Sequence, residues 1–247
     1  SQDLRRASWH TKRNEAALAV PLLQKVIARE GNGTNGVSTL SFAWAALGRA
    51  NAQMGEWREA AVAFDRALPL DPKSPSLRLA SGYAWLQVAR PDLAVDRLEQ
   101  SLALQPSIEG TLLLASAEIE HQRTLPAKER TWKRLEQLVN TLQHESAAVA
   151  KVPSPRRLDF LEADLALFRE AKDGNEWRGK DECLAVLERA ETAHADAEGF
   201  WSLAIFAYQR LGESAAADRA MEKFVALAKS PADQAIEYGA QADRRAR

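Results

Sequence analysis

Residues 41–74, SFAWAALGRANAQMGEWREAAVAFDRALPLDPKS, and residues 75–108, PSLRLASGYAWLQVARPDLAVDRLEQSLALQPSI, decide the fold of this chain because the second stretch repeats the first. Four identical pairs carry the repeat: Gly48 and Gly82, Ala60 and Ala94, Leu70 and Leu104, and Pro72 and Pro106. The members of each pair are 34 residues apart, as 94 minus 60 shows. A period of about 34 residues is typical of proteins built from stacked helix pairs. We therefore predict two antiparallel helices in each stretch.

The matched residues have structural roles in such a unit. Those expected to pack are Trp44, Leu47 and Gly48 in the first helix, and Ala60, Phe64 and Ala67 in the second. The second set is spaced i, i+4 and i+7, which places its members on one helical face. Gly48 has no side chain, so the second helix can approach the first closely. Pro72 ends the second helix, because proline cannot continue one.

The stretch 41–108 resembles two tetratricopeptide repeats, and the first is close to the family consensus. The residues that match the family signature are Trp44, Leu47, Gly48, Gly55, Trp57, Ala60, Phe64, Ala67 and Pro72. The resemblance implies an all-α fold, a right-handed α–α superhelix of antiparallel helix pairs, and a function in binding other proteins. Because the signature residues are structural, the resemblance does not identify a partner.

The pattern continues more weakly along the rest of the chain. We predict a helical N-terminal segment with a Gly-rich linker over 1–36, repeats over 37–144, a loop over 145–156, further helix pairs over 157–229 and a capping helix over 230–247. The N-terminal segment is expected to be a partial repeat or a cap. Of the repeats over 37–144, two are clear and one is divergent.

Individual helices can be predicted within these segments. One helix is expected over 11–30, kinked or restarted at Pro21, and another over about 126–143. A helix pair is expected over 157–172 and 178–193, joined by the polar loop 173–177. The closing unit repeats the packing spacing at Trp201, Ala204, Tyr208, Gly212, Ala217, Met221 and Phe224.

Composition agrees with stacked helices and argues against a nucleic-acid-binding protein. The chain has 247 residues, 46% of them hydrophobic and 27% charged, so it can bury a substantial core. The formal net charge is -1, and basic residues do not gather into the stripe that nucleic-acid binders show. The short basic runs 5–6, 12–13, 156–157 and 244–245 lie near ends or breaks of the chain, where solvated charge is the ordinary explanation.

Several apparent motifs do not indicate an active site. Residues 31–36 match G-x-G-x-x-G, but a helix and not a strand precedes them, so a linker is the better interpretation. The polar stretch 173–177 resembles the start of a calcium loop, but the central glycine falls one place late at Gly179 and Leu184 occupies the place of the closing glutamate. The four histidines have no partners at metal-ligand spacing, and the single cysteine, Cys183, is expected to be buried. We predict no catalytic residue, no metal ligand and no cofactor.

The surface expected to bind a partner is the concave wall, which the first helix of each unit lines in this family. By helical spacing from the packing residues, the side chains facing this wall are Ala45, Arg49, Gln53, Leu79, Tyr83, Gln87, Leu113, Ala117 and His121. This mixed surface suits an extended segment or a helix with apolar side chains. Family members that bind acidic chaperone tails use a Lys and Asn pair where this chain has Ala45 and Arg49, so that class of partner is not expected.

The resulting hypothesis is a non-enzymatic scaffold that binds a protein or peptide within a bacterial envelope, export or secretion assembly. A regulatory or accessory domain of a larger enzyme or transcription regulator is the alternative, and an enzyme with its site inside the helical stack is a third class. No apolar run is long enough to cross a bilayer, so a soluble protein of the cytoplasm or periplasm is expected. Whether the chain forms a homo-oligomer, and whether it is a fragment of a longer protein, stays open.

Overall fold

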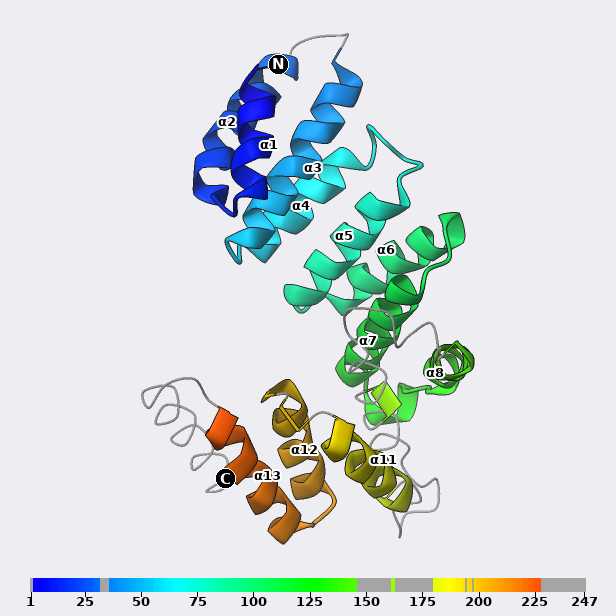
Figure 1. Ribbon diagram of the computed structural model, residues 1–247. Coiled ribbons are helices and arrows are strands. Elements are labelled where there is room, and N and C mark those ends of the chain that lie inside the picture. The colour runs from blue at the N-terminus through cyan, green and yellow to red at the C-terminus, as the bar shows by residue number, and fades with distance from the viewer. Residues whose placement is uncertain are drawn as a thin grey trace. The chain divides into compact units, whose positions relative to one another are not determined.

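The computed structural model describes residues 2–31, 36–145, 161–162, 180–193, 195–196 and 198–227 of the chain. Within those ranges the regular elements are all helices, which confirms the expected all-α fold (Figure 1). The chain divides into two compact units, residues 1–149 and residues 150–247.

In the first unit, each helix packs against the next one along the chain. The helices are α1 (Gln2–Lys12), α2 (Ala16–Glu30), α3 (Val37–Gln53), α4 (Trp57–Ala67), α5 (Pro75–Gln87), α6 (Pro91–Leu104), α7 (Ile108–Thr124), a 3-10 helix (Ala127–Glu129) and α8 (Lys133–His144). The short turns between partners make successive helices antiparallel. In the second unit, the described helices are α11 (Lys180–Ala193), α12 (Glu198–Arg210) and α13 (Ser214–Leu227), and α12 packs against both of the others.

One turn geometry recurs between the two helices of four pairs. Each of these turns has one residue in the left-handed conformation: Asn14 (φ 61), Gly55 (φ 79), Ala89 (φ 58) and Gly212 (φ 76). The next residue donates its backbone N–H to the carbonyl five residues earlier: Glu15 to His10 at 2.9 Å, Glu56 to Asn51 at 2.9 Å, Arg90 to Trp85 at 3.0 Å, and Glu213 to Tyr208 at 2.9 Å. This is the hydrogen bond that closes a helix through a left-handed residue. The pairs α1–α2, α3–α4, α5–α6 and α12–α13 are therefore units of one kind.

The second helices of these pairs bury matching positions. The buried sets, each spaced i, i+4 and i+7, are Ala19, Leu23 and Val26; Ala60, Phe64 and Ala67; Ala94, Leu98 and Ser101; and Ala217, Met221 and Phe224. Gly48 lies so close to this face that an added Cβ would be 2.7 Å from the Phe64 ring. Gly82 faces Leu98 in the same way, at 2.6 Å from Cγ. The predicted close approach at the paired glycines is confirmed.

Near the N-terminus the structure corrects the predicted single helix over 11–30. Two helices, α1 and α2, occupy residues 2–30, and they are separated by the turn at Asn14. Asparagine adopts the left-handed conformation more readily than other residues with a side chain, so it ends α1 where glycine ends α3. No new helix begins at Pro21, which lies inside α2 on its exposed side.

The divergent third unit also differs from the prediction. The helix expected over 126–143 is a 3-10 turn followed by α8, and Trp132 precedes the helix as its N-cap residue. Side chains supply hydrogen bonds to the backbone of the connection between α7 and α8. Arg130 Nε donates to the Leu125 carbonyl at 3.0 Å, and Gln122 Oε1 accepts from the Thr131 backbone N–H at 2.8 Å.

Other predicted elements fall mostly outside the described residues. These are the loop over 145–156, the helix over 157–172, the polar loop over 173–177 and the terminal helix over 230–247. The helix expected over 178–193 is represented by α11, and Cys183 is buried in it as predicted. In the closing unit all the predicted packing residues are buried except Gly212, which forms the turn.

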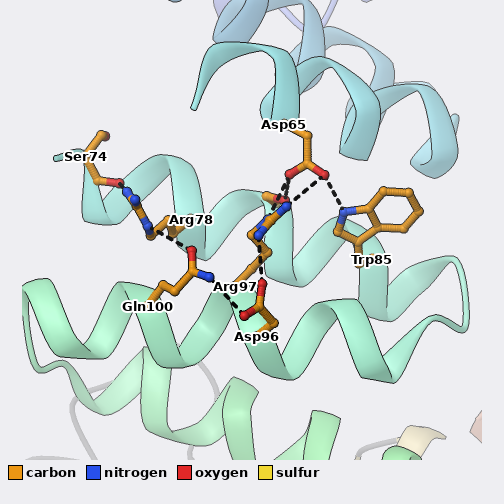
Figure 2. Close-up of polar contacts among 8 residues, drawn as sticks. Asp65, Ser74, Arg78, Trp85, Asp96, Arg97 and Gln100 are labelled. Atoms are coloured by element: carbon orange, nitrogen blue, oxygen red, sulfur yellow. Dashed lines mark hydrogen bonds and ion pairs between the residues drawn. The ribbon is translucent and has the colours of Figure 1, made fainter. Parts of the chain in front are cut away.

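Asp65 on α4 connects three helices in the first unit (Figure 2). Its carboxylate accepts hydrogen bonds from Ser81 Oγ at 2.6 Å and Trp85 Nε1 at 3.1 Å, both on α5. It also forms an ion pair with Arg97 on α6, with Nε 3.1 Å from Oδ1. Charged hydrogen bonds of this kind are stronger than neutral ones. Asp65 therefore joins the second helix of one pair to both helices of the next.

Candidate partner-binding surface

The nine side chains predicted to bind a partner lie on α3, α5 and α7, but they differ widely in exposure. Arg49, Gln53 and Gln87 are exposed, whereas Leu79, Tyr83 and His121 are partly buried. Ala45, Leu113 and Ala117 are buried, with at most 6% of their surface accessible. Helical spacing selected one side of each helix, and only part of that side is open to solvent.

On α3, Arg49 has an exposed aromatic neighbour that the sequence analysis missed. Phe42 lies seven residues earlier, which is about two helical turns, and 46% of its surface is accessible. The guanidinium carbon of Arg49 lies 5.8 Å from the centre of the Phe42 ring, within the range of a cation–π contact. Counting two turns back from Arg49 would have identified Phe42.

Arg49 is accessible, yet the surrounding protein affects its charge. Partial burial disfavours the charged form and lowers the pKa of the Arg49 guanidinium below its ordinary value. Within the part of the chain that the structure describes, no carboxylate forms an ion pair with this side chain. Arg49 is therefore a partly desolvated cation that a carboxylate from another molecule can reach.

Gln53, at the end of α3, already has a structural partner. Its side-chain amide donates to the backbone carbonyl of Thr11, the residue before the end of α1, at 3.1 Å. The bond joins the first helices of two successive pairs, which also contact each other directly. Gln53 contributes to the arrangement of the wall as well as to its surface.

On α5, Leu79 and Tyr83 pack against an apolar cluster that includes Leu113 and Ala117 of α7. The structure thus brings together four of the predicted residues. Tyr83 also meets Trp57 edge to face, with ring centres 5.5 Å apart. Such contacts hold an aromatic ring in one orientation, so Tyr83 is fixed while part of it stays accessible.

At the end of α7 the polar groups are largely engaged with one another. Glu118 is 4% accessible, and its carboxylate accepts a hydrogen bond from Gln122 Nε2 at 2.8 Å and lies 3.7 Å from Arg134. His121 Nδ1 is buried without a hydrogen-bond partner in the described structure. This end of the surface therefore combines the contacts of Glu118 with one buried His121 nitrogen that has no partner in the described residues, unlike the open faces of α3 and α5.

The second unit has an exposed aromatic residue at the corresponding place on α12. Phe206 is 46% accessible and follows Trp201 by five residues, as Arg49 follows Trp44. Two residues along the same helix, the Tyr208 hydroxyl donates to the Glu191 carboxylate of α11 at 2.7 Å. Phe206 was not among the predicted residues, although the offset from Trp201 would have identified it.

The described structure contains no group of side chains suited to a metal ion. Among these residues, no three His, Cys, Asp or Glu side chains are grouped so that they could hold a metal ion. Gly31 and Gly36 of the glycine-rich segment lie at the end of α2 and the start of α3, and residues 32–35 lie outside the described ranges. Among the described helices, none combines the length and apolar character that spanning a bilayer requires.

Comparison with known proteins identifies the helical repeat. Residues 42–84 match the family model of the tetratricopeptide repeat. The chain is similar to the crystal structure of a tetratricopeptide repeat protein from Parabacteroides merdae, with a TM-score of 0.71 and 15% identity over 94% of this chain and 81% of that chain. It is also similar to a thermophilic TPR protein from Thermus thermophilus, with a TM-score of 0.58 and 17% identity over 81% of this chain and 97% of that one. No curated protein sequence matches the chain.

Proposed function

Because the chain carries a tetratricopeptide repeat and has the fold of that family, we propose that it is a scaffold that binds a protein or peptide on the exposed faces of α3 and α5. The tetratricopeptide fold supports protein–protein interaction in general, and this chain acts by binding and not by catalysis. The partner is an extended segment or a helix that places one apolar side chain beside Phe42 and another beside Tyr83. A carboxylate of the same segment reaches Arg49.

The contact between Phe42 and Arg49 carries this proposal. An exposed phenylalanine beside a partly desolvated arginine without a carboxylate partner in the described structure offers both an apolar contact and a charged one. Aromatic residues and arginine contribute more to binding energy than most other interface residues do. Leu79 and Tyr83 extend the surface on α5, and they are held by the cluster beneath them.

A peptide selection tests the proposal. The purified chain is used to select binders from a random peptide library, and the affinities of the selected peptides are then measured for Phe42→Ala and Arg49→Gln variants. We expect each variant to weaken binding about tenfold, since losing a central contact costs roughly 1.4 kcal/mol or more.

Matched controls come from α4, the second helix of the pair that α3 begins. Val62 and Arg58 are exposed there, so Val62→Ala and Arg58→Gln remove the same kinds of group from a different surface. Selected peptides that bind the Phe42 and Arg49 variants as tightly as the unaltered chain would refute the proposed surface.

We also propose that the partner belongs to a multiprotein assembly of the envelope, export or secretion type. Attachment to an enzyme or transcription regulator is the competing proposal. The full open reading frame distinguishes the two, because only the second requires a catalytic or DNA-binding domain on the same chain.

A further inference from the structure

Helix α1 and the first residue of the turn after it bring two of the short basic runs to one exposed face. Arg5, Arg6, Trp9, Lys12 and Arg13 are spaced i, i+1, i+4, i+7 and i+8, and all five are exposed. The first four lie along one side of α1, with Trp9 at the centre, and Arg13 follows Lys12 in the turn. We call these five residues the α1 basic face.

The opposite side of α1 packs against the rest of the first unit. Ala7 is fully buried, and Leu4 packs against the cluster formed with α2 and α3. Asp3 forms an ion pair with Lys25 of α2, with 3.4 Å between Nζ and the carboxylate. The contacts that hold α1 in place therefore leave the α1 basic face uncovered by the described first unit.

The positive charge of this face is largely uncompensated. Arg5, Arg6 and Lys12 form no ion pair with any carboxylate in the described ranges. The acids nearest to them in the sequence are engaged elsewhere: Asp3 with Lys25, and Glu15 with His10 at 2.8 Å and Arg13 at 3.1 Å. Within the described structure, the face thus presents three cations without a carboxylate partner.

Trp9 is both exposed and held in place. It is 53% accessible, the Arg13 guanidinium lies over its ring at 4.7 Å, and the His10 ring meets it edge to face with centres 4.9 Å apart. A side chain that is already oriented loses less conformational freedom when it binds. Tryptophan and arginine are also among the residues most enriched at positions that dominate binding energy.

From this charge and this oriented tryptophan, we propose that the α1 basic face binds an acidic protein segment in which carboxylates flank an apolar side chain. The apolar side chain packs against Trp9, and the carboxylates pair with Arg5, Arg6 and Lys12. This site is separate from the α3–α5 surface of the proposed function, so the chain contacts two segments, of one partner or of two.

An acidic segment fits this face better than a nucleic acid or a membrane does. The neighbouring cations on α2, Lys25 and Arg29, are paired with Asp3 and Glu30, so the free positive charge does not continue as a track for phosphates. A helix that lies in a bilayer surface needs a broad apolar side, whereas Trp9 is the single apolar residue on this face.

The test uses the full chain and short fluorescein-labelled peptides whose binding is followed by anisotropy. One peptide has glutamates on both sides of a central phenylalanine, the second replaces the glutamates by glutamine, and the third replaces the phenylalanine by serine. We expect the first peptide to bind about tenfold more tightly than either of the others, because each of the others lacks one of the two contacts. Its affinity should also fall as salt is added.

Variants assign the binding to α1. The double change Arg5→Gln and Arg6→Gln, and the single change Trp9→Ala, should each weaken binding about tenfold. Arg58→Gln with Arg66→Gln removes the same charge from exposed positions on α4 and should have no effect. Circular dichroism checks that each variant is folded, and Trp9→Phe, which keeps an aromatic ring, should retain most of the affinity.

Defined outcomes would overturn the inference. They are equal binding of the glutamate and glutamine peptides, no binding of any peptide, an equal loss in the α4 control, and tighter binding to phosphatidylserine vesicles or to a DNA duplex than to the acidic peptide. Phe42→Ala should leave this binding unchanged, so failure here and failure of the α3–α5 surface can be told apart.

Discussion

Ala89 occupies a backbone conformation that glycine adopts more easily. Its φ of 58° lies in the left-handed region, where the equivalent positions 55 and 212 are glycine. A side chain in this region costs roughly 1 kcal/mol. The strain is tolerated because the turn that it closes is held by the Arg90 to Trp85 hydrogen bond.

Replacing this alanine should therefore stabilise the protein. We expect Ala89→Gly to raise the free energy of unfolding by about 0.5 to 1 kcal/mol, after allowing for the greater freedom of glycine in the unfolded chain. Urea titration followed by circular dichroism measures the change. Gly55→Ala is the reverse experiment and should destabilise the protein, since that glycine has φ +79°. Nothing lies within 4 Å of an added Cβ, so the cost comes from the backbone conformation alone. A loss of stability in Ala89→Gly would contradict this account of the turn.

Tyr208 makes the stability of the second unit depend on pH in the alkaline range. Burial, and next the hydrogen bond to Glu191, raise the pKa of its hydroxyl well above the ordinary value of 10. Below that pH, Tyr208 is protonated in both the folded and the unfolded chain. Above it, the unfolded chain releases the proton and the folded chain does not, so the free energy of unfolding falls as pH rises.

Removing the hydroxyl should weaken this dependence. Urea titrations at about pH 8 and about pH 11 should show a smaller loss of stability for Tyr208→Phe than for the unaltered chain. Tyr83→Phe, in the first unit, is the matched control and should lose stability as the unaltered chain does. An equal loss in Tyr208→Phe would show that this residue does not govern the alkaline response.

At the scale of the element, the connection between successive pairs depends on Asp65. This carboxylate joins α4 to Ser81 and Trp85 of α5 and to Arg97 of α6. We expect Asp65→Asn to lower the free energy of unfolding by about 1 to 2 kcal/mol, because Arg97 keeps only Asp96 as a charged partner and an amide cannot accept every donor. Its partial exposure places the effect at the lower end of the range for charged hydrogen bonds.

Chemical denaturation measures this loss, and Asp71→Asn is the control. Asp71 is exposed in the turn after α4, so the same change in charge should alter stability little there. The double-mutant cycle of Asp65→Asn with Arg97→Gln isolates their interaction. Additive losses would mean that the ion pair does not connect the two helix pairs.

The helices could be predicted from sequence where the repeat pattern is clear. They could not be predicted where an unusual turn residue or side-chain hydrogen bonds determine where a helix begins or ends. Spacing of apolar residues predicted α3 to α6, but the expected end of the second helix at Pro72 was wrong, since α4 ends at Ala67. The break between α1 and α2 was missed because Asn14 fills the left-handed position that glycine fills elsewhere. The start of α8 was missed because Arg130 and Gln122 supply the hydrogen bonds of the loop, and such side-chain partners have no periodic pattern.

The candidate surface was predictable in direction but not in exposure. A helical period shows which residues share a side of a helix, and Arg49, Gln53 and Tyr83 do retain accessible surface on the side that it selected. It does not show how closely the neighbouring helix covers that side. Ala117 is buried by its small size and by the packing of α5 on α7, whereas Phe42 stays accessible although it is large and apolar.

At the scale of the whole molecule, the chain consists of two compact units that use the same helix-pair geometry. Each unit exposes an aromatic residue on the first helix of a pair, Phe42 in one and Phe206 in the other. The faces on α3 and α1 belong to the first unit and differ in chemistry. The face on α3 is mixed and partly desolvated, and the face on α1 is open and cationic. The two proposed faces therefore suit segments of different chemistry.

The spacing of the left-handed turns has a practical consequence for protein engineering. Gly55 and Ala89 are 34 residues apart, whereas Asn14 and Gly55 are 41 apart, so the first interval is longer by seven residues. The connections are nearly equal, with six residues between α2 and α3 and seven between α4 and α5. The additional length therefore lies in the helices: α2 and α3 have 15 and 17 residues, whereas α4 and α5 have 11 and 13. The repeat thus tolerates about one additional helical turn in each of the two helices that flank a connection. An engineered array of these units can therefore vary its helix lengths by whole turns while the turn residues and the buried sets keep their spacing.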